Sequence, residues 1–351
     1  MTATLGRMDL DLLDRELAAR SERRFRARQV WEWVAGGAGD YREMTNLPAA
    51  LRADLAEAVP FSTLTVEREA RARDGTEKAL LRTGDGRPLE AVLMRYRDGR
   101  RSVCLSSQSG CPLTCTFCAT GGMRFARNLT ASEILDQALH FRRREAIDHV
   151  VFMGMGEPLL NLDPVLAACE RLPDLGVTAR RTTISTVGWI PGIERLTREG
   201  PHVRLAWSLH APEDALRSEL MPVNDRYPLG EVLAACRRWS SARRMPVFVE
   251  YLMLDGVNDR YEQALELARV LGREGTFKVN LIPYNPTETG FSGSSRAAID
   301  AFRTALVERG VPATVRLTRG REIDAACGQL AARKAPAREH AAREPRAGSM
   351  A

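Results

Sequence analysis

Three of the chain's seven cysteines lie close together, as Cys111, Cys115 and Cys118 in the stretch SGCPLTCTFCATGG. A structural zinc site takes four protein ligands and disulfides consume cysteines in pairs, so neither use fits a set of three. Thiolates also bind iron–sulfur clusters. Three of them on a four-iron cluster leave one iron free, which a molecule with an amine beside a carboxylate would chelate. The alternative is a zinc site completed by Cys104 or a histidine.

Other polar residues of interest follow predicted strands. Glu157 stands between Gly156 and Pro158 in MGMGEP, where a carboxylate is well placed to hold an ammonium group and glycine permits close approach. The further candidates are Ser185, Ser208, His210 and Asn285. The hydroxyl and imidazole groups of the first three could bind a ribose and a carboxylate, and the amide of Asn285 could bind the edge of an adenine. Taken singly, each is more often a locally bonded side chain than a ligand.

The remaining cysteines divide into two kinds. Cys169 and Cys236 lie in apolar helical patterns and are expected to be buried. Cys104 lies on the strand that leads into the cysteine loop, and Cys327 stands among small residues near the end of the patterned chain. The residues alone leave a buried and a reactive thiol equally open for Cys327. Glu90, by its own pattern, reads as a solvated strand residue.

The elements that would position these residues change along the chain. Residues 8–60 have helical periodicity, and 62–96 contain three short β-like runs split by turn signals. Strands and helices then alternate, with strands predicted at 101–107, 148–154, 180–186, 203–209, 246–254, 276–282 and 313–319. Such alternation predicts an α/β fold of parallel strands in an open sheet or a barrel, with ligands at the strands' carboxyl ends.

Composition sets broad limits. The chain has 351 residues, 44% hydrophobic and 27% charged, as in ordinary soluble proteins. It has no apolar run long enough to cross a bilayer, and acidic residues interrupt its N-terminus, which predicts a cytoplasmic protein without a membrane partner. A net charge of +6 favours a polyanionic partner such as RNA, although an arginine-rich genome gives a similar surface.

Six separated motifs, among them VCLSSQSGCPLTCTFCATGG, MGMGEPLLNL, VNLIPYNP and RGREIDAACGQL, resemble the RlmN/Cfr family of radical S-adenosylmethionine (SAM) RNA methyltransferases. The resemblance runs from about residue 23 to residue 331. It implies a (βα)6-type partial TIM barrel. The implied divisions are an N-terminal helical RNA-binding accessory domain at 1–62, a β-rich connector at 63–98, a radical SAM core with a C-terminal catalytic-cysteine loop at 99–331, and a disordered tail at 332–351.

The resemblance also implies roles for particular residues. Cys111, Cys115 and Cys118 would hold one 4Fe–4S cluster. The SAM contacts would be Gly156, Glu157, Ser185, Ser208, Leu209, His210 and Asn285. Arg124, in the exit of the cysteine loop, departs from the glycine usual in the family.

The implied reaction is methylation of adenosine C2 in 23S rRNA and in the anticodon loop of tRNAs, with two SAM molecules consumed per methyl group. Because C2 is an electron-poor carbon that carries hydrogen, polar methyl transfer has no nucleophile to use. Cys327 would take a methyl group, a SAM-derived radical would abstract hydrogen from it, and the methylene radical would add to C2. Glu90 would accept the C2 proton, and Cys104 would release the product through a transient disulfide with Cys327.

Two alternatives stay open at this point. A Cfr-type enzyme would methylate C8 of the same adenosine by the same chemistry, and a non-catalytic iron–sulfur or zinc RNA-binding protein would need no thiol at Cys327. The family further implies an electron donor such as flavodoxin or ferredoxin, and a monomer.

Overall fold

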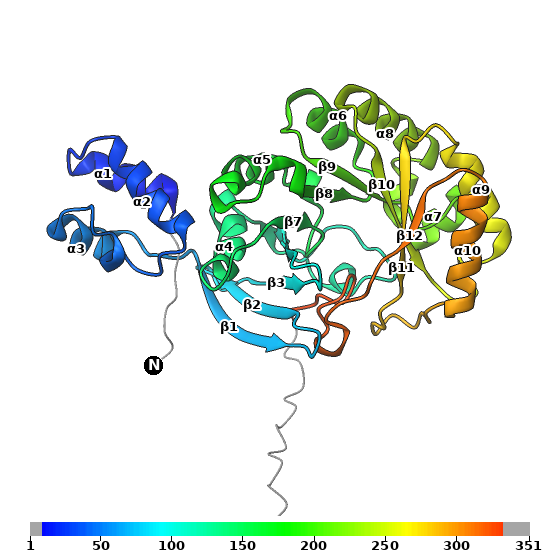
Figure 1. Cartoon of the computed structure of the whole chain (residues 1–351), viewed down its shortest axis with the longest axis horizontal. Coiled ribbons are helices and arrows are strands. Elements are labelled where there is room, and N and C mark those ends of the chain that lie inside the picture. The colour runs from blue at the N-terminus through cyan, green and yellow to red at the C-terminus, as the bar shows by residue number, and fades with distance from the viewer. Residues whose placement is uncertain (1–8, 333–351) are drawn as a thin grey trace, which may run out of the picture.

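The computed structural model describes residues 9–332, so the tail predicted at 332–351 lies, apart from Ala332, outside the described residues. The chain begins with three helices, α1 (Leu10–Ala19), α2 (Phe25–Gly36) and α3 (Ala49–Ala58), with a 3-10 turn at Tyr41–Glu43. Asp9 caps α1, since its side chain accepts hydrogen bonds from the backbone amides of Asp11 and Leu12. In Figure 1 these helices stand beside the rest of the molecule.

A single ten-stranded sheet forms the body of the protein. Its order is β1-β2-β3-β4-β7-β8-β9-β10-β11-β12, with antiparallel pairing from β1 to β4 and parallel pairing from β4 to β12. The strands are β1 (Leu64–Arg71), β2 (Glu77–Thr83), β3 (Pro88–Arg95), β4 (Arg101–Cys104), β7 (His149–Phe152), β8 (Thr182–Thr186), β9 (Arg204–Ser208), β10 (Val247–Met253), β11 (Phe277–Pro283) and β12 (Ala313–Val315). Because β12 does not pair with β4, the parallel part is an open, partial barrel, which confirms the predicted fold class.

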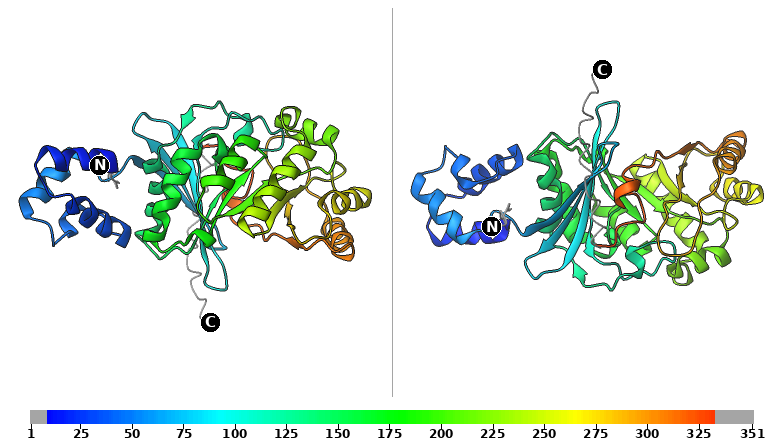
Figure 2. Two further views of the ribbon diagram at one scale, coloured as in Figure 1. Left: turned by 90° about the horizontal axis from the view of Figure 1, so that it is seen from above. Right: turned by 90° about the horizontal axis from the view of Figure 1, so that it is seen from below.

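The helices of the alternating part cover the outside of this sheet (Figure 2). They are α4 (Ala131–Arg142), α5 (Leu162–Arg171), α6 (Ile190–Glu199), α7 (Asp214–Leu220), α8 (Leu229–Arg243), α9 (Tyr261–Leu271) and α10 (Arg296–Glu308). Helix α4 starts with the capping box expected from its sequence, in which Thr130 and Glu133 each bond the other's backbone amide. None of the helices within residues 9–332 is long and apolar enough to cross a membrane.

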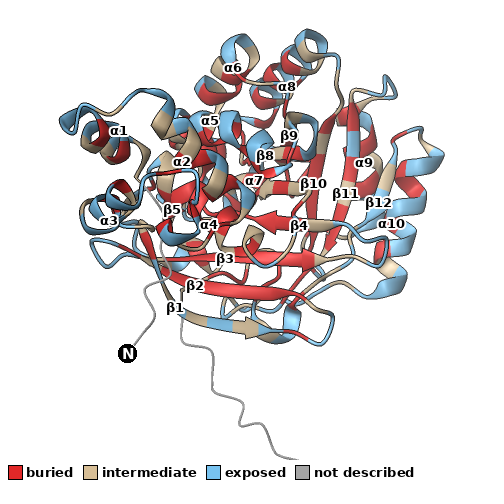
Figure 3. Cartoon of the chain, turned by 60° about the vertical axis from the view of Figure 1, so that its left-hand side comes forward, coloured by how far each residue is buried: buried red, intermediate tan, exposed pale blue. Residues whose placement is uncertain are grey.

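The strands of the predicted connector continue the barrel sheet. Strand β3 pairs with β4, with Val92 opposite Cys104 and Arg95 opposite Arg101. A small hairpin of β5 (Gln108–Ser109) and β6 (Arg127–Asn128) follows β4, so the strand predicted at 101–107 ends at Cys104. Figure 3 shows the central strands buried and the helices exposed on their outer faces.

Alternation along β10 separates the core from the barrel interior. Val247, Val249 and Tyr251 are fully buried in the main hydrophobic cluster. The residues between them, Phe248 and Glu250, line cavities inside the barrel. The same two-residue period on each strand brings polar side chains from seven strands into that interior.

Candidate functional site

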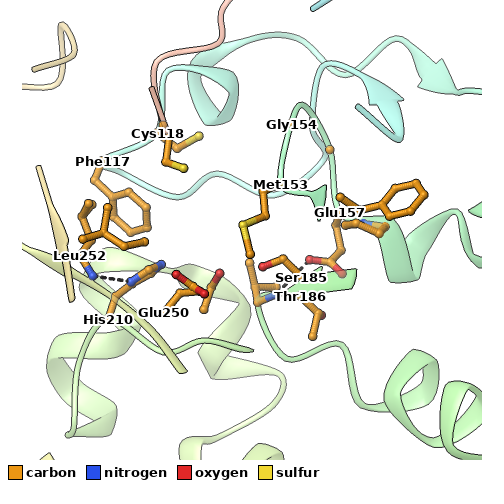
Figure 4. A pocket seen from close by; sticks show the side chains of 18 of the residues that line it. Phe117, Cys118, Met153, Gly154, Glu157, Ser185, Thr186, His210, Glu250 and Leu252 are labelled. Carbon is orange, nitrogen blue, oxygen red and sulfur yellow. Dashed lines mark hydrogen bonds between the residues drawn. The ribbon is translucent and has the colours of Figure 1, made fainter. Parts of the chain in front are cut away.

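The carboxyl ends of the parallel strands surround a cavity of about 150 Å³ (Figure 4). Its wall includes Cys118 from the cysteine loop, Glu157 after β7, Ser185 on β8, and Ser208 and His210 at the end of β9. A second cavity, of about 130 Å³, shares Glu157, Ser208 and His210 with the first and is lined by all three clustered cysteines, Cys111, Cys115 and Cys118. The structure therefore brings the cysteine loop and these strand ends to one place.

Close backbone contacts shape the cysteine loop. A Cβ atom on Gly121 would lie 2.6 Å from the Cys115 carbonyl oxygen, and one on Gly110 would lie 2.4 Å from the Arg124 oxygen. Arg124, the departure noted in the sequence, is itself exposed, so only its backbone takes part in this packing. An arginine side chain is therefore accommodated there.

The donor chemistry of this loop fits a cluster better than a single ion. No three His, Cys, Asp or Glu residues among those described are arranged around a single metal ion. Thiolates on separate irons of a four-iron cluster stand further apart than ligands of one ion. Burial raises the pKa of Cys111 to about 12 and also raises that of Cys118, so these thiols are protonated without a metal and would lose their protons on binding one.

Glu157 is a buried carboxylate that faces the cavity, with no cationic side chain within 4.0 Å among residues 9–332. It is 3% exposed, and its two oxygens accept the backbone amides of Leu159 and Val187, each at 3.0 Å. Burial raises its pKa to about 7 despite these bonds. Gly156 before it has φ +95°, and a Cβ there would lie 2.5 Å from the Gln108 Cβ. A ligand ammonium would supply the missing positive charge.

His210 is held as a neutral imidazole. Its Nδ1 accepts the Leu252 amide at 3.0 Å, which fixes the tautomer with the proton on Nε2. Burial, followed by the charge of Arg217, lowers its pKa to about 3. The ring stands edge-on to Phe117, with centroids 4.9 Å apart, and it offers the cavity a hydrogen-bond donor without a positive charge.

Two of the expected SAM contacts lie elsewhere. Leu209 is fully buried in the main hydrophobic cluster and lines neither cavity. Asn285 lies in a smaller neighbouring cavity, where its Nδ2 donates to the Cys327 carbonyl oxygen at 3.3 Å and its Oδ1 is buried without a partner. In this structure Asn285 thus positions the Cys327 loop.

That loop reaches the site from the far end of the sequence. Cys327 lines both the main cavity and the smaller neighbouring one, and Cys104 lines the smaller one with it. The Ala119 amide donates to the Gly328 oxygen at 2.8 Å, and the Gln329 side chain donates to the Pro286 oxygen at 3.0 Å. Burial raises the pKa of the Cys104 thiol to about 12. All seven cysteines are free in the structure.

Glu90 is fully buried, so its reading as a solvated strand residue is wrong. Its Oε2 accepts the backbone amides of Ala331 and Ala332 at 2.9 and 3.1 Å, and its Oε1 lies 2.9 Å from Lys78 Nζ. Lys78 in turn donates to the Asp324 oxygen at 3.0 Å. The carboxylate fastens the end of the cysteine-bearing loop to the sheet and does not line the main cavity.

The residues by themselves did not single out Lys78 or Arg316. Arg316 lines the main cavity and the smaller one beside Cys327, and its Nη1 lies 3.6 Å from Glu250 Oε2. The nearby Cys327 and Glu250 raise its pKa. A signal was present, because Arg316 follows Thr314 at strand spacing in the last predicted strand and so faces the barrel interior.

Known proteins resemble this chain over nearly its whole length. Residues 105–268 match the radical SAM superfamily, and residues 4–60 match the ribosomal RNA large subunit methyltransferase N-terminal domain. The dual-specificity RNA methyltransferase RlmN of Pelobacter propionicus is 44% identical over 95% of this chain and 97% of its own. A probable dual-specificity RNA methyltransferase RlmN of Moorella thermoacetica is 46% identical over 90% of this chain and 93% of its own.

A solved structure agrees with these sequence matches. The crystal structure of a radical SAM methyltransferase from Sphaerobacter thermophilus superposes with a TM-score of 0.87 at 47% identity, covering 92% of this chain and 98% of that one. With this fold, this cysteine loop and identities of 44% and 46% to its relatives, the chain belongs to the RlmN family of dual-specificity RNA methyltransferases.

Proposed function

We propose that this chain methylates C2 of an adenosine in 23S rRNA and in the anticodon loop of tRNAs. The observation that carries the proposal is a separate thiol, Cys327, held in the cavity wall beside the cysteine loop. A protein that only bound RNA through a metal would have no use for it. The names of the relatives, which are dual-specificity RNA methyltransferases, support both RNA classes.

Two groups of residues in the cavity walls suit the two cofactors of the family. Cys111, Cys115 and Cys118 would bind a 4Fe–4S cluster, and Gly156, Glu157, Ser185, Ser208 and His210 would bind SAM. When bound, the cluster and SAM supply the methyl group and the one-electron chemistry that an unreactive aromatic carbon needs. Glu157 would bind the SAM ammonium group, and neutral His210 would donate a hydrogen bond from Nε2 without repelling that cation.

Cys327 would carry the methyl group to the base. Its loop is fixed by Asn285 and Ala119, so the sulfur is held at the cavity while RNA approaches. In the release step the Cys104 thiolate would attack the Cys327 sulfur. The S–S bond would form as the bond between that sulfur and the product carbon breaks, and the carbon, left with the electron pair, would take a proton to complete the methyl group. Burial raises the pKa of the Cys104 thiol to about 12 and the charge of Arg316 offsets this only in part, so Cys104 would have to give up its proton before it attacks.

Glu90 would serve as proton acceptor only after a rearrangement. Its carboxylate is bonded to the amides of Ala331 and Ala332 and paired with Lys78. We therefore assign it the anchoring role in this conformation. Acceptance of the C2 proton would require the loop to release it.

The remaining assignments follow from an RNA substrate. The N-terminal helical domain would contact RNA, where Arg23, Arg24 and Arg28 are exposed on or next to α2. An electron donor such as flavodoxin or ferredoxin would reduce the cluster. We also propose a monomer located in the cytoplasm, where the ribosomal and transfer RNAs are.

The test is Cys327→Ala with Cys169→Ala as its control, because Cys169 is a buried residue of α5 that lines neither cavity. Mass spectrometry of RNA modified by the reconstituted enzyme should show C2-methyladenosine with the wild type and the control, and none with Cys327→Ala. The iron–sulfur absorbance should be the same in all three proteins. Full activity in Cys327→Ala would refute the methyl-carrying role, and C8-methyladenosine from the wild type would show a Cfr-type enzyme.

A further inference from the structure

A further cavity, of about 420 Å³, opens at the opposite end of the barrel, and we name it the lower cavity. Residues at or near the amino ends of the strands line it, among them His149 on β7, Thr183 on β8, Arg204 on β9, Phe248 on β10 and Asn280 on β11. Met153, Glu250 and Arg316 line both this cavity and the main one, so they form a layer between the two. The residues assigned to the cluster and to SAM do not reach it.

Positive charge dominates the lower cavity. Four arginines line it, namely Arg100, Arg181, Arg204 and Arg316, together with His149. Glu250 is the one carboxylate among its lining residues in the described part of the chain. Asp148 lies just outside, where it is hydrogen-bonded to His149 and the charge of Arg181 helps to lower its pKa.

The four arginines differ in whether a carboxylate lies within ion-pair distance. Arg316 lies 3.6 Å from Glu250, and Arg100 lies 3.9 Å from Asp98. Arg181 and Arg204, in contrast, have no carboxylate within 4.0 Å among residues 9–332, and Arg181 acts on Asp148 only from beyond ion-pair distance. Arg204 is half-buried with its guanidinium 5.9 Å from the centre of the Phe248 ring, an arrangement that holds the charge toward the cavity.

We propose that the lower cavity binds the phosphoryl group of a small phosphorylated molecule. Two guanidiniums at one cavity, with no ion-pair partner among residues 9–332, match a phosphate, which accepts paired N–H bonds from arginine. Thr183 adds a hydroxyl donor between them in the sheet, since β8 carries Thr183 opposite Arg204 of β9. Because residues of the strands from β4 to β12 line the cavity, it admits a small ligand or a terminal phosphate and excludes a nucleic-acid helix.

The site is separate from the proposed methylation chemistry, and its test does not depend on that activity. Pyrophosphate binding to the full chain would be measured by calorimetry at low ionic strength, with the double variant Arg181→Ala/Arg204→Met and the control Arg180→Ala. Arg180 is an exposed neighbour of Arg181 that does not line the cavity, and methionine keeps an apolar stem over Phe248. The double variant should weaken binding by tenfold or more per arginine, and the control by less than twofold.

A second arm distinguishes the source of the phosphate. Binding of a short single-stranded RNA would be measured with the same three proteins. Equal losses of pyrophosphate binding in the double variant and the control would reduce the effect to net charge and overturn the proposal. A loss confined to RNA would assign the arginines to the substrate backbone and overturn it as well. If the double variant unfolds, Arg181→Ala alone, on the exposed 3-10 turn Ala179–Arg181, must still weaken pyrophosphate binding.

Discussion

The pair formed by Lys78 and Glu90 should be one of the costliest interactions in the protein to break. Both side chains are buried, at 7% and 0% exposure, and Nζ lies 2.9 Å from Oε1. Lys78→Met leaves Glu90 Oε1 with no cation and no hydrogen-bond donor, because the loop amides of Ala331 and Ala332 both bind Oε2. Removing one member of a buried pair costs about 3–5 kcal/mol, and we expect the lower end because Oε2 keeps its two bonds.

The assay is urea unfolding at neutral pH, with Lys278→Met as control because Lys278 is an exposed lysine on β11. Lys78→Met should lower the free energy of unfolding by about 3 kcal/mol, and the control by less than about 0.5 kcal/mol. Adding Glu90→Gln to Lys78→Met removes the unpaired charge but keeps an oxygen for the loop amides. That double variant should recover to within about 1 kcal/mol of the wild type.

The same variants should also change the cysteine-bearing loop. Lys78→Met removes the bond from Lys78 to the Asp324 oxygen and leaves only Glu90 to hold the loop end, so alkylation of Cys327 by a maleimide should become faster than in the Lys278→Met control. A loss below about 1 kcal/mol in Lys78→Met would show that water reaches the pair and would refute this reasoning. A stable protein with unchanged Cys327 reactivity would show that other contacts hold the loop.

Two further predictions concern the strand end at Glu157. Burial raises the pKa of Glu157 to about 7 in the folded protein from about 4.5 unfolded, so this one group should remove about 3 kcal/mol of stability from the metal-free protein as pH rises from 4.5 to 7. Unfolding measured across this range should show that contribution as the difference between the wild type and Glu157→Gln. Gly156→Ala should destabilise the protein by at least about 1–2 kcal/mol and weaken SAM binding, because φ +95° is strained for alanine and its Cβ would meet Gln108. Gly84→Ala is the control: a Cβ there has nothing within 4 Å, so it should change neither thermal unfolding nor SAM titration.

Local sequence patterns were enough to predict most of the architecture. Helical periodicity and strand–helix alternation predicted the helices, the parallel strands and the edge where Glu157, Ser185 and Ser208 meet, because these depend on near neighbours and on the general geometry of parallel sheets. The strand predicted at 101–107 is shorter in the structure, where β4 ends at Cys104. After Cys104 the chain leaves the ladder, and the amides of Ser107 and Gln108 instead donate to the Met155 oxygen at 2.9 and 3.2 Å.

Glu90 illustrates what local patterns cannot show. A glutamate on a short strand is usually solvated, yet the residues bonded to Glu90 are Ala331 and Ala332, 241 and 242 positions along the chain. Lys78 lies diagonally across the β2–β3 ladder, since it stands opposite Val92. The residues around Glu90 predict neither the register of that hairpin nor the packing of the last loop against it.

The position of Cys327 depends on the same long-range contacts. The thiol lies on a loop after the last strand, and four anchors from distant parts of the chain hold that loop, namely Glu90 on β3, Ala119 in the cysteine loop, and Asn285 and Pro286 after β11. Each anchor is itself fixed only when its strand has joined the sheet. The thiol is therefore placed beside the cysteine loop only in the completely folded barrel. This dependence explains why the buried pair of Lys78 and Glu90 should influence the reactivity of Cys327, which is far away in the sequence.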